Sequence, residues 1–258
     1  KNTHNYSLKT QLRCLLGGDE YISYIKEIFS NNPPKEKMDF NEYELKIFDN
    51  VDQMIKNIKN KNEMYGLCRN VAGYAWKWNS KGKKLPMHVT KKEVQKMKEN
   101  NVYDIEIDGY KYIWNSQPTD WINSENSINE IGSIHTTQGF DLNYTGLIIG
   151  NELKYDDINH KIIVDRNNYF DAKGKAGTSD EELLEYILHI YQTMCTRGMR
   201  GTYLYVCDEK LKEYLSKYID KYNGSGITYK IDEKEDNNIL MVAEEDEEYK
   251  SDKNNEID

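Results

Sequence analysis

The sequence lacks long apolar runs. Nowhere in its 258 residues do about 18 apolar residues follow one another, and no charged start precedes an apolar stretch near the first residue. These absences argue against membrane insertion and against export. We therefore expect a cytoplasmic protein.

Metal-ligand and disulfide patterns are missing as well. The four cysteines, Cys14, Cys68, Cys195 and Cys207, include no C-x-x-C pair, and the five histidines have no zinc-ligand spacing. The cysteines are predicted to be small buried side chains in a reducing compartment. No metal site is predicted in this chain.

A phosphate-binding loop of the form G-x-x-x-x-G-K-[ST] is also absent. The two Gly-Lys pairs, Gly82-Lys83 and Gly174-Lys175, lack both the glycine spacing and the following hydroxyl residue. We therefore expect that this chain alone does not hydrolyse ATP. Its first residue is Lys1 and not methionine, which is consistent with a piece of a longer protein.

The acidic charge is concentrated at the carboxyl end. The net charge is −9, and residues 232–258 contain twelve acidic and three basic residues, so the preceding part is neutral. Such a composition predicts one domain over residues 1–243 and an acidic, disordered tail over residues 244–258. The tail either only solvates the chain or competes with nucleic acid for a basic surface.

A lysine-rich segment lies within the neutral part. Residues 80–101 contain seven lysines and two glutamates, and they belong to an apparent insertion over residues 80–117. Trp76 and Trp78 precede the lysines. Basic groups for a nucleic-acid backbone and aromatic rings for base stacking are what a single-strand track needs. A solvated helix face with core tryptophans is the alternative.

Apolar periodicity alternates between helix and strand along the chain, which predicts an α/β fold with a parallel sheet covered by helices on both faces. Helices are predicted over residues 19–30, 51–63, 180–195 and 209–222. Strands are predicted over residues 43–48, 67–75, 128–134, 144–149, 202–207, 227–231 and 239–242, and a small strand or two within residues 80–117.

Two segments carry residues suited to phosphate chemistry. SIHTTQGFDLNYTGLIIG (133–150) places Thr137, Gln138, Gly139 and Asp141 in a polar loop between two apolar runs. YQTMCTRGMRG (191–201) follows with two arginines, which can neutralise the charge of a transferring phosphate.

These segments resemble the late motifs of superfamily 1 helicases, and the wider sequence resembles the Schlafen group 3-like DNA/RNA helicase domain of bacterial proteins. The resemblance covers nearly the whole chain. The matching segments are LKTQLRCLLGGDEYISYI (8–25), VAGYAWKWNS (71–80), Trp114-Asn115, the loop with His135, Gln138, Gly139 and Asp141, and Thr196-Arg197-Gly198.

The resemblance implies the C-terminal RecA-like half of an ATP-dependent helicase or translocase, which acts on DNA or RNA, as a single strand. ATP and Mg²⁺ would be held mainly by an N-terminal P-loop domain of the same protein. The implied catalytic residues are Arg13 and Arg197. The implied nucleotide-binding residues are Gln11, Gln138, Gly139, Asp141 and Arg200, and the nucleic-acid-binding ones are His135, Thr137, Trp76 and Trp78.

Two other functions remain open. Asp141 followed by Glu152-x-Lys154 has the Asp…Glu-x-Lys pattern of Mg²⁺-dependent nucleases. A non-enzymatic nucleic-acid-binding module with a RecA-like shape is the second. The pair Asp208-Glu209 imitates the acidic end of a Walker B strand, but we interpret it as an ordinary helix start.

Overall fold

The computed structural model describes residues 16–40, 42–80, 91–117 and 119–224. The chain divides into a compact unit over Lys1–Lys221 and a second unit over Tyr222–Asp258. The predictions for Gln11, Arg13, the strands after residue 224 and the acidic tail lie outside the described residues.

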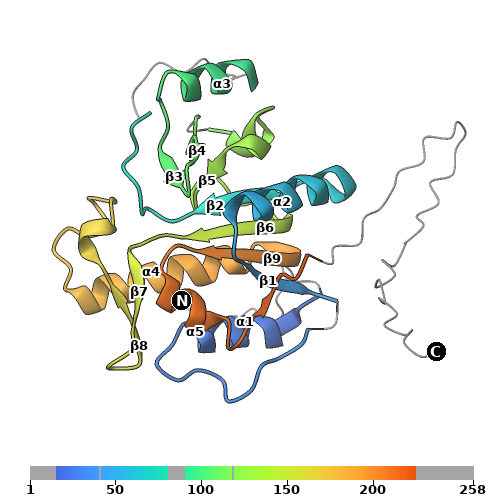
Figure 1. Ribbon diagram of the computed structural model, residues 1–258. Coiled ribbons are helices and arrows are strands. Elements are labelled where there is room, and N and C mark those ends of the chain that lie inside the picture. Colours follow the sequence, from blue (N-terminus) through green and yellow to red (C-terminus); the bar gives the residue numbers. More distant parts are fainter. Residues whose placement is uncertain (1–15, 41, 81–90, 118, 225–258) are drawn as a thin grey trace, which may run out of the picture. The chain divides into compact units, whose positions relative to one another are not determined.

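A six-stranded sheet forms the centre of the first unit (Figure 1). Its order is β10 (Asp220–Lys221), β1 (Glu44–Phe48), β9 (Gly198–Val206), β6 (Leu142–Ile149), β2 (Arg69–Ala72) and β5 (Ile131–Gly132). Every pair within it is parallel. The central strands β6 and β9 are almost wholly buried, as expected for a parallel sheet covered on both faces.

Helices cover both faces of this sheet (Figure 1). On one face lies α2 (Val51–Tyr65); an added Cβ at Gly146 of β6 would meet Ile58 of this helix. On the other face, α1 (Gly18–Ile28), α4 (Asp180–Cys195) and α5 (Glu209–Leu215) share one apolar core with Leu147 and Leu204. The arrangement confirms the predicted α/β class and is consistent with a RecA-like fold.

Side-chain caps fix where the helices begin. Asn50 Oδ1 accepts from the Gln53 amide at 2.9 Å before α2, and Ser179 with Glu182 forms a reciprocal capping box before α4. Asp208 Oδ1 accepts from the Leu211 amide at 2.8 Å, which confirms that Asp208-Glu209 is a helix start.

Three predicted elements are markedly shorter than expected, and one of them, the strand predicted over residues 67–75, is reduced to β2. Helix α5 ends at Leu215, and not at residue 222, because the Leu215 carbonyl accepts from the Tyr218 and Ile219 amides and the chain turns into strand β10. The strand predicted over residues 128–134 is reduced to β5, since residues 127–129 form a 3-10 turn.

Two antiparallel pairs lie outside the main sheet. The segment between β2 and β5 contains α3 (Lys91–Glu99) and the pair β3 (Ile105–Ile107) and β4 (Tyr110–Tyr112). The second pair, which was not predicted from the sequence, is β7 (Leu153–Asp156) and β8 (Lys161–Val164). In the part of the chain that the structure describes, no helix is long and apolar enough to cross a membrane.

Candidate functional site

The loop of residues 133–141 has a fixed internal geometry. The Ser133 carbonyl accepts from the Thr137 amide at 3.3 Å and from the Thr137 hydroxyl at 3.0 Å. The Ser133 amide donates to Thr136 Oγ1 at 2.8 Å. Gly139 has φ +87°, a backbone conformation that side chains with a Cβ disfavour. Thr137 is fully buried, so its side chain holds the loop together and is not presented to a ligand.

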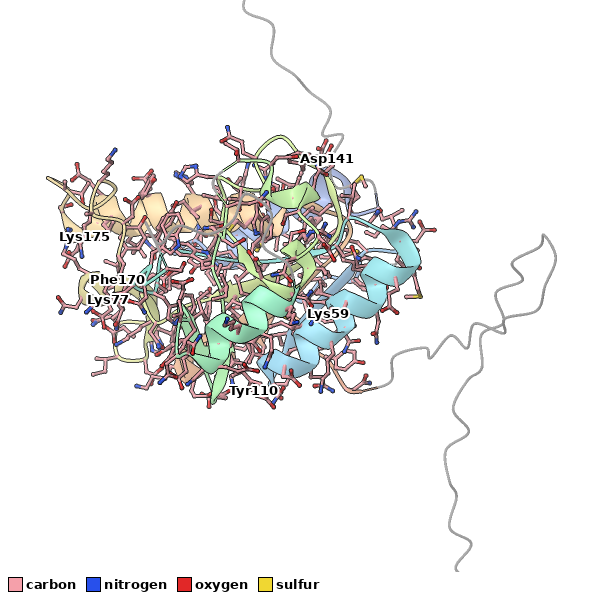
Figure 2. All side chains as sticks on the ribbon, turned by 90° about the horizontal axis from the view of Figure 1, so that it is seen from above. Lys59, Lys77, Tyr110, Asp141, Phe170 and Lys175 are labelled. Carbon is pink, nitrogen blue, oxygen red and sulfur yellow. The ribbon has the colours of Figure 1, made fainter. Side chains whose placement is uncertain are left out.

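The end of this loop lies against the arginine motif. The Leu142 amide donates to the Arg197 carbonyl at 3.0 Å, and Leu142 pairs with Gly198 in the parallel register of β6 and β9. Asp141, which directly precedes Leu142, is exposed (Figure 2). The predicted residues Asp141 and Arg197 are therefore brought together at the amino edge of the sheet.

The two arginines of the motif differ in exposure. The Arg197 side chain is only 5% exposed. Arg200 is exposed; its Nε donates to Asn143 Oδ1 at 3.3 Å and its guanidinium lies 4.9 Å from the centre of the Tyr65 ring. Tyr65 and Asn143, which contact Arg200, were not predicted from the sequence. Gln138 and Gly139 are exposed on the neighbouring loop.

A partly exposed carboxylate ties this edge together. Glu44, at the start of β1, accepts hydrogen bonds from Lys61 at 2.6 Å, from Tyr144 at 2.7 Å and from Tyr203. Burial acts to raise the pKa of Glu44, but the bonds from Lys61, Tyr203 and Tyr144 outweigh it and the pKa is lowered. One acidic group thus connects β1, β6, β9 and α2 beneath the amino edge.

The other end of the loop opens into a hollow at the carboxyl edge of β2 and β5. The hollow has a volume of about 900 Å³ and is lined mainly by aromatic rings and lysines. Three of the four residues predicted to bind nucleic acid line this hollow: Trp76, Trp78 and His135. Five further lining residues were not predicted from the sequence: Tyr74, Lys77, Phe170, Lys173 and Tyr186.

Short contacts hold the rings of the hollow in place. The Phe170 amide donates to the Tyr74 carbonyl at 2.7 Å, so two distant segments meet there. Trp78 Nε1 donates to Ser80 Oγ at 3.1 Å. Trp114 is 1% exposed and forms the floor; the centre of its ring lies 4.9 Å from that of Tyr74. Lys77 lies over the Phe170 ring at 6.0 Å (Figure 2).

Glu152 lies buried beneath the segment that carries Trp76. Tyr191 donates to its Oε1, and its Oε2 has no hydrogen-bond partner among the described residues. Burial raises the pKa of Glu152 to about 7, although the Tyr191 bond partly opposes this. Gly150 permits the approach, because a Cβ there would clash with Ala75 and with Glu152 Oε2.

This placement contradicts the nuclease alternative. Asp141 and Glu152 lie at opposite ends of the eight-residue strand β6, which spans about 26 Å at about 3.3 Å per residue. Glu152 is fully buried, and Lys154 pairs with Asp165 at 2.7 Å. The three side chains cannot hold one Mg²⁺ ion. Across the residues described, no group of three or more His, Cys, Asp or Glu side chains is placed to hold a metal.

Known proteins match this sequence as follows. The uncharacterised Saccharomyces cerevisiae protein YPL245W is 30% identical over 183 residues, which cover 67% of this chain and 36% of that protein. The chain thus spans just over a third of that relative's length. No solved structure matches. The family model described as Schlafen group 3, DNA/RNA helicase domain, matches residues 1–208, and the chain therefore belongs to that helicase domain family.

Proposed function

We propose that this chain is the C-terminal motor half of an ATP-dependent DNA/RNA helicase or translocase. Its amino edge would face a nucleotide held by a P-loop domain of the same protein, and its aromatic hollow would take a single strand. The observation that carries the proposal is the loop of residues 133–141. It lies beside Arg197 at one end and lines the hollow through His135 at the other.

The residues of the amino edge fit a nucleotide. Gln138, Gly139 and Asp141 are exposed, and a Cβ added at Gly139 would meet nothing within 4 Å, so a ligand can approach the backbone closely. The Asp141 carboxylate can accept a hydrogen bond from a ribose hydroxyl. Bound ATP with Mg²⁺ would supply the phosphoryl group that is transferred to water.

The arginines would act on the phosphates. Arg200 is exposed, so its positive charge can attract the phosphates before the two domains close. Arg197 has only a small exposed surface and must be uncovered when the two domains close. An arginine that reaches the γ-phosphate stabilises the charge that spreads over its oxygens, an effect of about 10³ to 10⁵ in rate. Gln11 and Arg13 stay predictions for the same site.

The hollow fits single-stranded nucleic acid. Trp76 and Trp78 are half-buried in the lining of the hollow, and Lys77 and Lys173 line it beside them. Rings of this kind stack on any base, and lysines attract the phosphates. The binding would therefore tolerate many sequences.

The loop would couple the two ends. Ser133 is bonded to Thr136 and Thr137, and the Thr137 carbonyl accepts from the Phe140 amide at 3.2 Å. A displacement at Asp141 would be carried through these bonds to His135. Thr137 thus acts through the loop's shape. Closure of the domains on ATP would change the hollow, and a bound strand would favour closure.

The test is nucleic-acid-stimulated ATP hydrolysis by the full-length protein, with and without Thr137→Val. This variant keeps the side-chain volume but loses the bond to Ser133. We expect basal hydrolysis to remain while stimulation by a single strand falls several-fold. Strand binding without any hydrolysis in the full-length protein would contradict the motor and favour the non-enzymatic binding module. Hydrolysis by the isolated 258-residue chain would contradict the shared site.

A further inference from the structure

A second hollow, distinct from the aromatic one, lies between α2, α3 and the β3–β4 pair. Its volume is about 400 Å³, and its lining includes four lysines, Lys56, Lys59, Lys98 and Lys111, against a single aspartate, Asp52. Figure 2 shows Lys59 on α2 and, below it, Tyr110 of the hairpin. We refer to it as the basic pocket.

The lysines come from three separate elements, so their charges converge through the tertiary fold. Lys56 and Lys59 lie on α2, Lys98 on α3 and Lys111 on β4. Asp52 neutralises Lys56 at 2.7 Å. Burial lowers the pKa of Lys98, and the nearby charge of Lys59 lowers it further. An anion between Lys59 and Lys98 would relieve this repulsion.

Neutral hydrogen-bonding groups complete the pocket. The Tyr112 side chain is 7% exposed, and its hydroxyl has no hydrogen-bond partner among the described residues. Asn126 and Asn129 also line the pocket; one N–H of each is used inside the protein, by Glu130 at 3.0 Å and by Asn126 at 3.2 Å, which leaves the second N–H of each as a donor. Ammonium, hydroxyl and amide groups together are the donors that phosphate oxygens accept from.

The basic pocket is joined to the aromatic hollow by one stretch of chain. Tyr110, Lys111 and Tyr112 of β4 line the basic pocket, and Trp114, which pairs with Ile131, lines the aromatic hollow. Two extended residues span about 7 Å. The two hollows are therefore close enough to contact neighbouring parts of one strand.

We propose that the basic pocket binds a phosphate group of the nucleic-acid backbone, on the same strand whose bases stack in the aromatic hollow. This inference rests on the proposed function for the identity of the strand. The shared chemistry is a phosphate anion, which a free phosphate could also supply. The pocket adds affinity without reading the base sequence, because its donors face the backbone.

The first experiment compares two double variants in the full 258-residue chain, each of which removes two lysine charges. Lys59→Gln with Lys98→Gln removes two charges from the pocket. Lys92→Gln with Lys96→Gln removes two exposed charges of α3 outside the pocket lining. The affinity for a labelled single-stranded oligothymidylate is measured by fluorescence polarisation over a series of salt concentrations.

We expect the pocket pair to weaken binding about tenfold and to lower the slope of log affinity against log salt by about 0.7 for the lost phosphate contact. The Lys92/Lys96 pair should change the affinity less than twofold. Equal effects of the two pairs would overturn the proposal, because the attraction would then be a general charge effect.

A second measurement separates this proposal from the proposed function. Inorganic phosphate is titrated into the chain while the side-chain amide signals of Asn126 and Asn129 are followed by NMR. One outcome is that phosphate shifts these signals in the wild type and not in Lys59→Gln with Lys98→Gln, while the oligonucleotide does not bind. This outcome would show a site for free phosphate and overturn the strand assignment. If phosphate causes no shifts and the oligonucleotide does not bind, the pocket itself is overturned. Oligonucleotide binding with the expected difference between the pairs supports the pocket and the strand-binding part of the proposed function.

Discussion

The amide of Leu142 donates a hydrogen bond of 3.0 Å to the carbonyl of Arg197. This bond begins the parallel pairing of β6 with β9, and it sets Asp141 next to the arginine motif. Two motifs that are far apart in the sequence thereby share one edge of the sheet. The proposed nucleotide contacts depend on this pairing, because each motif alone offers only a loop or a helix end.

Replacing Trp76 by alanine should weaken single-strand binding by about 5- to 150-fold, since stacking on one ring contributes about 1–3 kcal/mol per base. Trp76→Phe keeps a stacking surface and should recover most of the affinity. The measurement is fluorescence polarisation of a labelled oligonucleotide with the isolated chain. An alanine variant that binds like the wild type would show that bases do not stack at this position.

The stability of the protein should fall as the pH rises from about 4.5 to about 7. Glu152 has a folded pKa of about 7 against an ordinary value of 4.5, so in this range the unfolded chain releases the proton first. The contribution of Glu152 to the free energy of unfolding is fully present below its ordinary pKa. About 3 kcal/mol of that free energy is lost by the time the pH passes the pKa of Glu152 in the folded state. Urea unfolding across this range measures the slope.

Glu152→Gln is the matched variant for this pH dependence. It keeps an acceptor for Tyr191 but cannot ionise, so the decline between pH 4.5 and about 7 should flatten. An unchanged slope in the variant would assign the decline to other groups.

Ser179→Ala should destabilise the protein by about 1 kcal/mol, because it removes the cap that accepts from the Glu182 amide at 3.2 Å. Helix α4 ends directly before Thr196 and Arg197, yet the cap lies at its other end. We therefore expect a lower melting temperature, read by circular dichroism, with unchanged oligonucleotide affinity at 20 °C. A loss of affinity in the folded variant would contradict this separation.

Gly139→Ala and Gly177→Ala form a matched pair. Both glycines have positive φ, +87° and +74°, and an added Cβ at either meets nothing within 4 Å. Each substitution should cost about 1 kcal/mol through backbone strain alone. In the full-length protein, only Gly139→Ala should also slow ATP hydrolysis, because only that backbone would face the nucleotide. Equal rates in the two variants would place the nucleotide elsewhere.

Strong local signals made much of the fold predictable. The predicted bounds of α4 are identical to those observed, since a Ser-x-x-Glu cap precedes a clear apolar periodicity. β1 and β6 were found from short apolar runs. The β7–β8 pair was missed because its turn is made by Asp156, whose carboxylate accepts from the Ile158 and Asn159 amides.

The candidate site was predictable only in part. The loop and the arginines carry local sequence patterns, whereas the hollow is assembled from segments that tertiary contacts bring together. Phe170 and Tyr74 are joined by a backbone hydrogen bond that no local sequence pattern predicts. The same limit explains the wrong nuclease alternative: the spacing of Asp141 and Glu152 looked short in sequence, but the intervening strand is extended and holds them apart.

The most direct test of the motor is the rate of ATP hydrolysis by the full-length protein after substitution of Arg197. We predict that Arg197→Ala lowers the turnover rate by about 10³-fold or more while ATP binding persists. Because Arg197 is largely buried, the alanine variant can fail to fold, and Arg197→Lys is then the test variant. It keeps the positive charge but loses the planar guanidinium. The lysine variant should also hydrolyse ATP slowly, and its melting temperature should equal that of the wild type. Folded Arg197 variants with the wild-type turnover rate would contradict the account.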